Sequence, residues 1–227
     1  MRTPLLLLSL LVAFLTSCSV PQPRVNSEEA RLPSTIVVVH GLYANSRHVQ
    51  PLKDGLTAKG FTCFAPDLTP NNGSVSIETL AQQLNSYIEQ NIAPQTPLQI
   101  IGHSMGGLVA LQYLQTPHNS RRCRGLYTIA TPHQGTLLAS FHGGPAGRQM
   151  ATQSPFLKKL HARQPAFPVV TYRSSNDFVI IPNSSSKLSF AENKVITSSG
   201  HNEILRSSEL LNDLTRLIQS HDNHISP

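Results

Sequence analysis

The chain has 227 residues, a formal net charge of +6, and charged side chains at only 13% of positions. This length is enough for one α/β domain with a sizeable hydrophobic core. Its basic residues are scattered, apart from the short clusters Arg121-Arg122-Arg124 and Lys158-Lys159. Nucleic-acid binding requires a basic patch with aromatic support, which this sequence lacks. We therefore expect no nucleic-acid partner.

The N-terminus has the pattern of an export signal. Met1-Arg2 precedes an almost wholly apolar run from Leu5 to Leu15, which is too short to span a bilayer stably. The run ends in Leu15-Thr16-Ser17-Cys18, which resembles the lipobox of bacterial lipoproteins. We expect a signal peptide over 1–17 and lipidation of Cys18. The alternatives are an ordinary signal peptide with a coincidental cysteine, or a single membrane anchor.

Residues 18–33 are expected to form a flexible tether, because they contain three prolines and few large apolar side chains. Several acyl chains on Cys18 would hold the protein stably at a membrane, whereas one chain binds only marginally. Ser19, rather than an aspartate, follows the cysteine. In Gram-negative lipoproteins this resembles an outer-membrane destination. The expected location is therefore the cell envelope, with the protein anchored in a membrane by lipid.

Six apolar or β-branched segments predict strands, at Thr35–Val39, Phe61–Ala65, Leu98–Ile101, Gly125–Ala130, Phe167–Tyr172 and Lys194–Thr197. Apolar residues at helical spacing predict helices between or after them, at Val49–Leu56, Ile77–Ile88, Ser104–Gln115 and Ile204–Ile218. This alternation indicates an α/β fold with a doubly wound, mostly parallel sheet.

One domain is expected over 34–220, followed by a polar tail over 221–227. The segment Thr131–Pro165, between two predicted strands, is rich in Gly, Pro, Ser and His. We expect it to contain a short helix near Gln153–His161 and to form a modest cap over the sheet edge.

The segment Gly102-His103-Ser104-Met105-Gly106 lies directly between a predicted strand and the apolar start of a helix. In this context G-x-S-x-G is typical of a nucleophile elbow, a sharp turn that exposes a serine hydroxyl above the sheet. Glycines on both sides let the chain pass close to itself. The pattern predicts that Ser104 is a nucleophile and that Met105 directs its N–H at the reaction site. The alternative is a structural glycine turn.

Three further residues follow other predicted strands. The segment His40-Gly41-Leu42 resembles the oxyanion loop of lipases, and this resemblance implies that Leu42 offers a second backbone N–H to an oxyanion. The alternative is that His40 and Gly41 only cap the end of a strand. Asp177 and His201 follow the last two strands. Loops after parallel strands emerge at one sheet edge, so Ser104, Asp177 and His201 are expected to converge there. His201 would act as the base, and Asp177 would orient it in acyl transfer.

Other residues compete for these roles. His133 follows a strand and is an alternative base, but it is favoured as a pocket residue, together with Tyr43. Asp67 is the main competing acid, while Glu203 is expected to begin the last helix. His103 is expected to serve packing, with its side chain directed away from the nucleophile. The remaining histidines considered have no strand-end placement: His118, His142, His161, His221 and His224.

The sequence shows no metal-ligand spacing among its histidines, cysteines and carboxylates, and no glycine-rich dinucleotide fingerprint. We therefore expect no metal and no cofactor. Oligomeric state is not indicated by any pattern.

Several segments resemble the α/β-hydrolase superfamily, and within it small bacterial triacylglycerol lipases and the GPI-inositol-deacylase-like group. They are Val37–Leu42, Gly102–Gly107, Ile129–Gly135 and the segments around Asp177 and His201. The resemblance implies a compact α/β-hydrolase fold and a serine lipase or esterase acting on acyl esters or lipids. The alternatives are an acyltransferase or thioesterase with the same triad, or a non-catalytic envelope protein that binds lipid. The chain departs from larger lipases in lacking a long lid insertion, which argues against interfacial activation.

The resemblance also bears on the two remaining cysteines. It implies that the strand of Cys63 lies near one sheet edge, with the strand after Cys123 about three positions across, roughly 14 Å away. A disulfide tolerates at most about 7 Å between Cα atoms. We therefore predict two unpaired thiols.

Overall fold

The computed structural model describes residues 34–197 and 200–223. The predicted signal peptide, the lipidation site Cys18 and the tether lie outside this part of the chain, and so do Ser198, Ser199 and residues 224–227. The N-terminal expectations therefore stay predictions. Within the described ranges, no helix is both long and apolar enough to cross a membrane.

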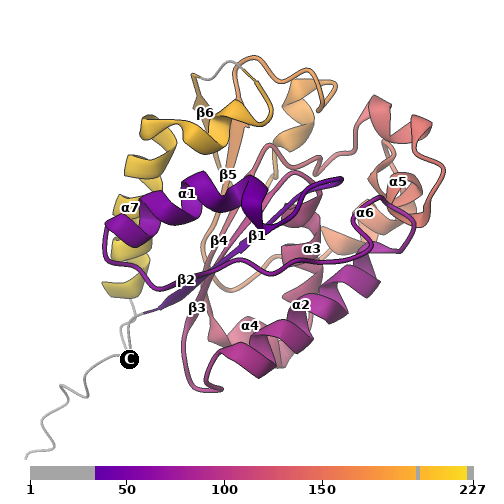
Figure 1. The fold of residues 1–227 in the computed structure, drawn as a ribbon. Coiled ribbons are helices and arrows are strands. Elements are labelled where there is room, and N and C mark those ends of the chain that lie inside the picture. The colour runs from indigo at the N-terminus through magenta and orange to yellow at the C-terminus, as the bar shows by residue number, and fades with distance from the viewer. Residues whose placement is uncertain (1–33, 198–199, 224–227) are drawn as a thin grey trace, which may run out of the picture. The chain divides into compact units, whose positions relative to one another are not determined.

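A six-stranded parallel sheet forms the centre of the described domain (Figure 1). Its strands are β1 (Thr35–Val39), β2 (Cys63–Phe64), β3 (Leu98–His103), β4 (Cys123–Ile129), β5 (Val169–Ser174) and β6 (Glu192–Ile196). They lie side by side in the order β2-β1-β3-β4-β5-β6, and every neighbouring pair is parallel. The predicted α/β fold with about six mostly parallel strands is confirmed. The chain winds outward in both directions from β1 and β3, so a topological switch point lies between their carboxyl ends.

Helices cover both faces of the sheet. In Figure 1, α1 (Ser46–Ala58) and α7 (Ser208–Asn223) lie on one face, opposite α2 (Ile77–Asn91) and α3 (Met105–Tyr113). Successive side chains of a strand point to opposite faces. Accordingly, Val37 and Val39 pack into the core beneath α2 and α3, whereas Ile36 and Val38 pack beneath α1 and α7.

The shorter elements are α4 (Pro117–Arg122), η1 (Leu137–Phe141), α5 (Pro145–Met150), α6 (Pro155–Leu160), η2 (Asn183–Ser186) and η3 (Glu203–Arg206). The predicted cap thus exists, and it contains η1, α5 and α6. It is fastened to the start of α2, where Ile77 N–H donates to Gln149 Oε1 (2.7 Å) and Gln149 Nε2 donates to Glu78 Oε2 (2.5 Å).

The C-terminal helix extends further than the sequence indicated. The tail was expected from residue 221, but α7 continues to Asn223. His221 Nδ1 lies 2.8 Å from the hydroxyl of Tyr127, and Gln99 Nε2 donates to Asp222 Oδ1 (2.8 Å). Gln99 and Tyr127 are buried polar residues on the sheet, and buried polar groups require partners. This need explains why the helix continues over them and why the expected tail boundary is wrong.

The two cysteines in the described part of the chain are free. Cys63 lies on the edge strand β2, and Cys123 begins β4, three positions along the sheet order. The prediction of two unpaired thiols is confirmed. Burial raises the pKa of the Cys123 thiol to about 12, so it is an inert core residue.

Candidate active site

Ser104 joins β3 to α3 in a strained conformation. Its φ of 54° and ψ of −128° are unfavourable for a residue with a side chain, and such strain is concentrated at functional sites. The turn is held by the Ser104 N–H, which donates to the carbonyl of Ile129 (2.8 Å). At Gly106, a β-carbon would overlap the backbone carbonyls of Val39 and His40. The turn therefore has the sharp geometry that the pattern predicted.

The loop after β1 passes directly over Ser104. A β-carbon built on Gly41 would lie 2.8 Å from the Ser104 β-carbon and 3.3 Å from its Oγ. The next residue in this loop is Leu42. The Leu42 N–H has no hydrogen-bond acceptor among the described residues. The N–H of Met105 has none there either, because Met105 is the first residue of α3 and the first N–H groups of a helix have no partner within it. One unpaired donor thus belongs to the residue after Ser104, and the other belongs to the residue after Gly41, which lies against Ser104.

His40 braces this loop rather than entering the site. Its Nδ1 lies 2.9 Å from the Gly41 carbonyl oxygen, and its Nε2 accepts from the Leu68 N–H (2.9 Å). Burial lowers the pKa of the His40 imidazole. The neutral ring, donating at Nδ1 and accepting at Nε2, satisfies both of these contacts.

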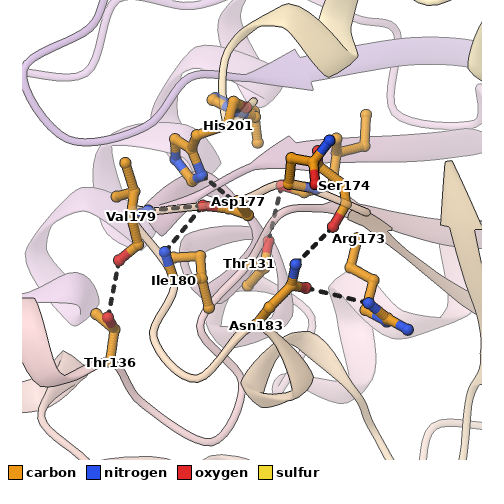
Figure 2. Close-up of polar contacts among 12 residues, drawn as sticks. Thr131, Thr136, Arg173, Ser174, Asp177, Val179, Ile180, Asn183 and His201 are labelled. Atoms are coloured by element: carbon orange, nitrogen blue, oxygen red, sulfur yellow. Dashed lines mark hydrogen bonds and ion pairs between the residues drawn. The ribbon is translucent and has the colours of Figure 1, made fainter. Parts of the chain in front are cut away.

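Asp177 and His201 are directly paired. His201 Nδ1 lies 2.8 Å from Asp177 Oδ2, while Asp177 Oδ1 accepts from the N–H groups of Val179 (2.8 Å) and Ile180 (2.9 Å), as Figure 2 shows. Burial raises the pKa of the Asp177 carboxyl, but the His201 hydrogen bond and charge and these two N–H donors outweigh it and lower that pKa overall. An ionised Asp177 therefore fixes the orientation of the His201 ring.

Ser104 and His201 line the same cavity, which has a volume of about 400 Å³. Both residues are largely buried, with 9% of their surface exposed. Asp177 is not among the lining residues and supports His201 from behind. The cavity wall is mostly apolar, formed by Gly41, Leu42, Tyr43, Ala44, His48, His103, Ser104, Pro132, Thr136, Leu138, Ala139, His142, Met150, Val179, Ile180, His201 and Asn202.

Exposed apolar side chains gather around this cavity. Among described residues, five of the six exposed large apolar side chains belong to three adjoining segments: Tyr43, Leu137, Phe141, Phe178 and Val179. The Tyr43 ring lies 5.6 Å from that of His142, next to Phe141. Leu137 N–H donates to the Ile181 carbonyl (3.0 Å), which ties η1 to the loop carrying Phe178 and Val179. Clustered apolar exposure of this kind marks a binding surface.

The competing acids are occupied elsewhere. Asp67 Oδ1 accepts from the Ser46 N–H (2.6 Å) at the start of α1, next to the N-cap Asn45. Glu203 was expected to begin the last helix, but it begins the separate short element η3, and α7 starts only at Ser208; its carboxylate lies against Gly200. The structure brings Asp177, rather than Asp67 or Glu203, into hydrogen-bond contact with His201.

Of the two predicted pocket residues, Tyr43 lines the cavity and His133 does not. The His133 ring is buried, with Nε2 2.8 Å from Thr128 Oγ1 and its ring 5.4 Å from that of His161. The pocket role predicted for His133 is therefore wrong. Because the Thr128 hydroxyl pairs with the imidazole inside the fold, the ring turns inward instead of facing the site.

Three histidines contribute in ways that the sequence did not indicate. His48 and His142 line the cavity. His142 follows no predicted strand. His48 lies in the first turn of α1, which begins at Ser46, three residues before the predicted helix start at Val49. His103 was expected to point away from the nucleophile, but its ring lies 4.9 Å from that of His201 and lines the cavity.

No group of three or more metal-ligating side chains occurs in residues 34–197 and 200–223.

Comparison with known proteins identifies the family. A family model described as the alpha/beta hydrolase fold matches residues 34–202. The chain belongs to the α/β-hydrolase family. The sheet order and the elbow of Ser104 described above are those of an α/β-hydrolase. A search of curated proteins finds no relative of the sequence.

Solved structures share the α/β-hydrolase fold at low sequence identity. The mature lipase BlEst2 of Bacillus licheniformis is 16% identical, with a TM-score of 0.63, covering 82% of this chain and 92% of that one. A structure of the metagenome-derived lipolytic enzymes LipS and LipT is 17% identical, with a TM-score of 0.63 and coverage of 84% and 96%. The thioesterase domain from the curacin biosynthetic pathway is 16% identical, with a TM-score of 0.58 and coverage of 82% and 91%. The narrower GPI-inositol-deacylase-like grouping stays a prediction.

Proposed function

We propose that this α/β-hydrolase is a serine esterase that cleaves carboxylic esters through Ser104, His201 and Asp177. One observation carries the proposal: a serine in the strained elbow conformation and a histidine oriented by a carboxylate line one cavity. The roles follow from these positions.

The reaction would proceed in two halves. His201 Nε2 takes the proton from Ser104 Oγ as this oxygen attacks the ester carbonyl carbon. The oxyanion that forms accepts hydrogen bonds from the N–H groups of Leu42 and Met105. Collapse of the tetrahedral intermediate releases the alcohol, which is protonated by His201 and leaves an acyl-enzyme. Water, deprotonated by His201, then attacks the acyl carbon and releases the carboxylic acid and Ser104.

Asp177 contributes without moving a proton. Its carboxylate holds the Nδ1–H of His201 and stabilises the imidazolium that forms during the reaction. The two backbone N–H groups that bind its other oxygen keep it ionised and fixed.

The cavity supports an ester with an apolar acyl group. Its wall is mostly apolar, and its surroundings include the exposed Tyr43, Phe141 and Phe178. Two of the structural relatives described above are lipolytic enzymes. We therefore propose acyl esters or lipids as the substrate class. A thioester is the second candidate, because a thioesterase domain shares the fold and would use the same acyl-enzyme.

Labelling with a fluorophosphonate tests the proposal directly. We expect covalent modification of Ser104 in the wild type and none in Ser104→Ala, whose turnover of a short-chain ester should fall by about 10⁵-fold. Ser86→Ala, at an exposed position on α2, is the control and should be labelled normally. Near-full activity of Ser104→Ala would overturn the proposal. Oxoester, thioester and competing-alcohol assays then separate esterase, thioesterase and acyltransferase.

We also propose that the enzyme is anchored in the cell envelope through lipidated Cys18. The support is the Leu15-Thr16-Ser17-Cys18 sequence after an apolar segment. Cys18→Ser should move the protein out of the membrane fraction, whereas the control Cys63→Ser should not. Retention of Cys18→Ser in the membrane fraction would argue instead for an uncleaved anchor.

A further inference from the structure

A second hollow adjoins the cavity of Ser104. It has a volume of about 440 Å³ and shares four lining residues with that cavity, namely Tyr43, Ala44, His48 and Asn202. Its remaining wall comes from the start of α1 and from η3, two elements that pack against each other. A molecule bound at Ser104 could therefore extend into it without leaving the protein surface.

The second hollow carries positive charge. Arg47, in the first turn of α1, and Arg206, at the end of η3, both line it, and both are exposed. Neither guanidinium forms an ion pair with another described residue. The one carboxylate in the wall is Glu203, so the fixed charges sum to +1. Asp67 is not part of the wall; it accepts from the Ser46 N–H, and its carboxylate charge interacts with the Arg47 guanidinium from outside the hollow.

The two hollows differ in what they would bind. The first hollow, which contains Ser104 and His201, is mostly apolar. The second is more polar than the first and carries net positive charge, and the four shared residues lie at the junction. Arginine guanidinium groups bind phosphate and carboxylate oxygens in a planar, two-pronged geometry. An ester that fills both hollows would carry an apolar acyl group at one end and an anionic group at the other.

We propose that the hollow between α1 and η3 is a binding subsite for an anionic group on the alcohol part of the ester. This inference rests on the proposed esterase function and narrows its substrate class to esters of anionic alcohols. Arg47 and Arg206 bind the anion, and the negative charge of Glu203 weakens that binding. The acyl chain occupies the apolar cavity, so the leaving alcohol departs through the cationic hollow.

Matched esters test the inference. The probes are monobutyrin, its 3-phosphate and the butyryl ester of glycerate, which share an acyl chain and differ in the charge of the alcohol. We expect the wild-type kcat/KM to be about tenfold higher for one or both anionic esters than for monobutyrin. The comparison between phosphate and carboxylate shows which anion fits. Equal kcat/KM for all three esters would overturn the proposal.

Variants that remove a positive or a negative charge should change the anionic-to-neutral kcat/KM ratio in opposite directions. Arg47→Gln and Arg206→Gln should each lower the anionic-to-neutral kcat/KM ratio by about threefold to tenfold, and the double variant should bring it near one. Glu203→Gln should raise the ratio. Arg121→Gln, on the distant α4, is the matched control and should leave the ratio at its wild-type value. A ratio that does not respond to Arg47 and Arg206 would contradict the assignment.

A binding measurement separates this inference from the proposed function. Saturable binding of glycerol 3-phosphate, but not of glycerol, should occur in the wild type and be lost in the Arg47→Gln/Arg206→Gln double variant. If Ser104 is not labelled and no ester is cleaved, the esterase proposal fails, while this titration still decides whether the anion subsite exists. Absence of binding would overturn the subsite.

Discussion

The Nε2 atom of His103 lies 2.9 Å from the backbone carbonyl oxygen of His201, so the residue before the elbow serine is tied to the residue proposed as its base. Since a carbonyl only accepts, Nε2 carries the hydrogen and donates. Burial, with the neighbouring His201 charge, lowers the pKa of His103 to about 3, so its ring stays neutral near pH 7. His103 thus connects the β3–α3 turn to the loop after β6.

This contact predicts that His103 is a positioning residue. His103→Phe keeps a ring but loses the donor, so we expect kcat to fall by about tenfold to a hundredfold, with little change in KM, because the proposed base is displaced. His103→Gln restores an amide donor and should recover much of the loss. Steady-state kinetics on a soluble short-chain ester measure these changes in kcat and KM. Thermal unfolding checks that each variant is folded. Full kcat in His103→Phe would exclude a positioning role.

The pairing of Asp177 with His201 predicts a large effect that no other carboxylate in the neighbourhood should share. Asp177→Asn would favour the wrong His201 tautomer and lower kcat by about 10⁴-fold. Asp67→Asn, in contrast, weakens one contact at the start of α1, where Asn45 is the N-cap, and should cost at most about 1 kcal/mol of stability. Initial rates and urea denaturation of both variants separate the effects. Similar losses of activity in the two variants would contradict the assignment.

The sheet and its main helices could be predicted from the sequence because their burial requires apolar residues at regular spacings. Strands covered on both faces are continuous apolar runs, as at Thr35–Val39, and amphipathic helices repeat every three or four residues, as in α2. Elements such as η1, α5 and η3 are too short to show a period. They are stabilised by contacts between distant segments, which no local pattern encodes.

The same distinction applies to the site. Ser104, Asp177 and His201 follow strands, and parallel strands place the loops that follow them at one edge, so their proximity could be inferred. His142 lies in the cap, and its place at the cavity depends on how η1 folds back. His133 also follows a strand, but the direction of its ring is set by the partner Thr128, which the sequence pattern does not indicate.

The buried His133 predicts how stability depends on pH. Burial, together with the neighbouring His161, lowers the pKa of His133 well below its ordinary value, whereas in the unfolded chain it lies near 6.5. Below about pH 6.5 the unfolded chain therefore binds a proton that the folded one does not. The free energy of unfolding should fall as the pH drops from 7 toward 4, with this residue contributing at most about 1.4 kcal/mol per pH unit.

Substitution checks that slope. His133→Gln removes the titrating group, so its free energy of unfolding, measured by urea denaturation between pH 4.5 and 7, should depend less steeply on pH than that of the wild type. The exposed His118→Gln is the matched control and should retain the wild-type slope. An unchanged slope in His133→Gln would show that other groups govern the acid sensitivity.

The geometry of the elbow predicts that alanine substitution at two glycines has different effects on stability. Gly106→Ala would place a β-carbon against the carbonyls of Val39 and His40, which belong to the central strand and the loop over Ser104 and have little room to move. Overpacking against such backbone should cost about 3 kcal/mol or more of unfolding free energy. Gly143→Ala, where no atom lies within 4 Å of the new β-carbon, should stay within about 0.5 kcal/mol of the wild type. Urea denaturation measures both, and a Gly106→Ala variant as stable as Gly143→Ala would mean that α3 does not approach β1 as closely as the elbow geometry requires.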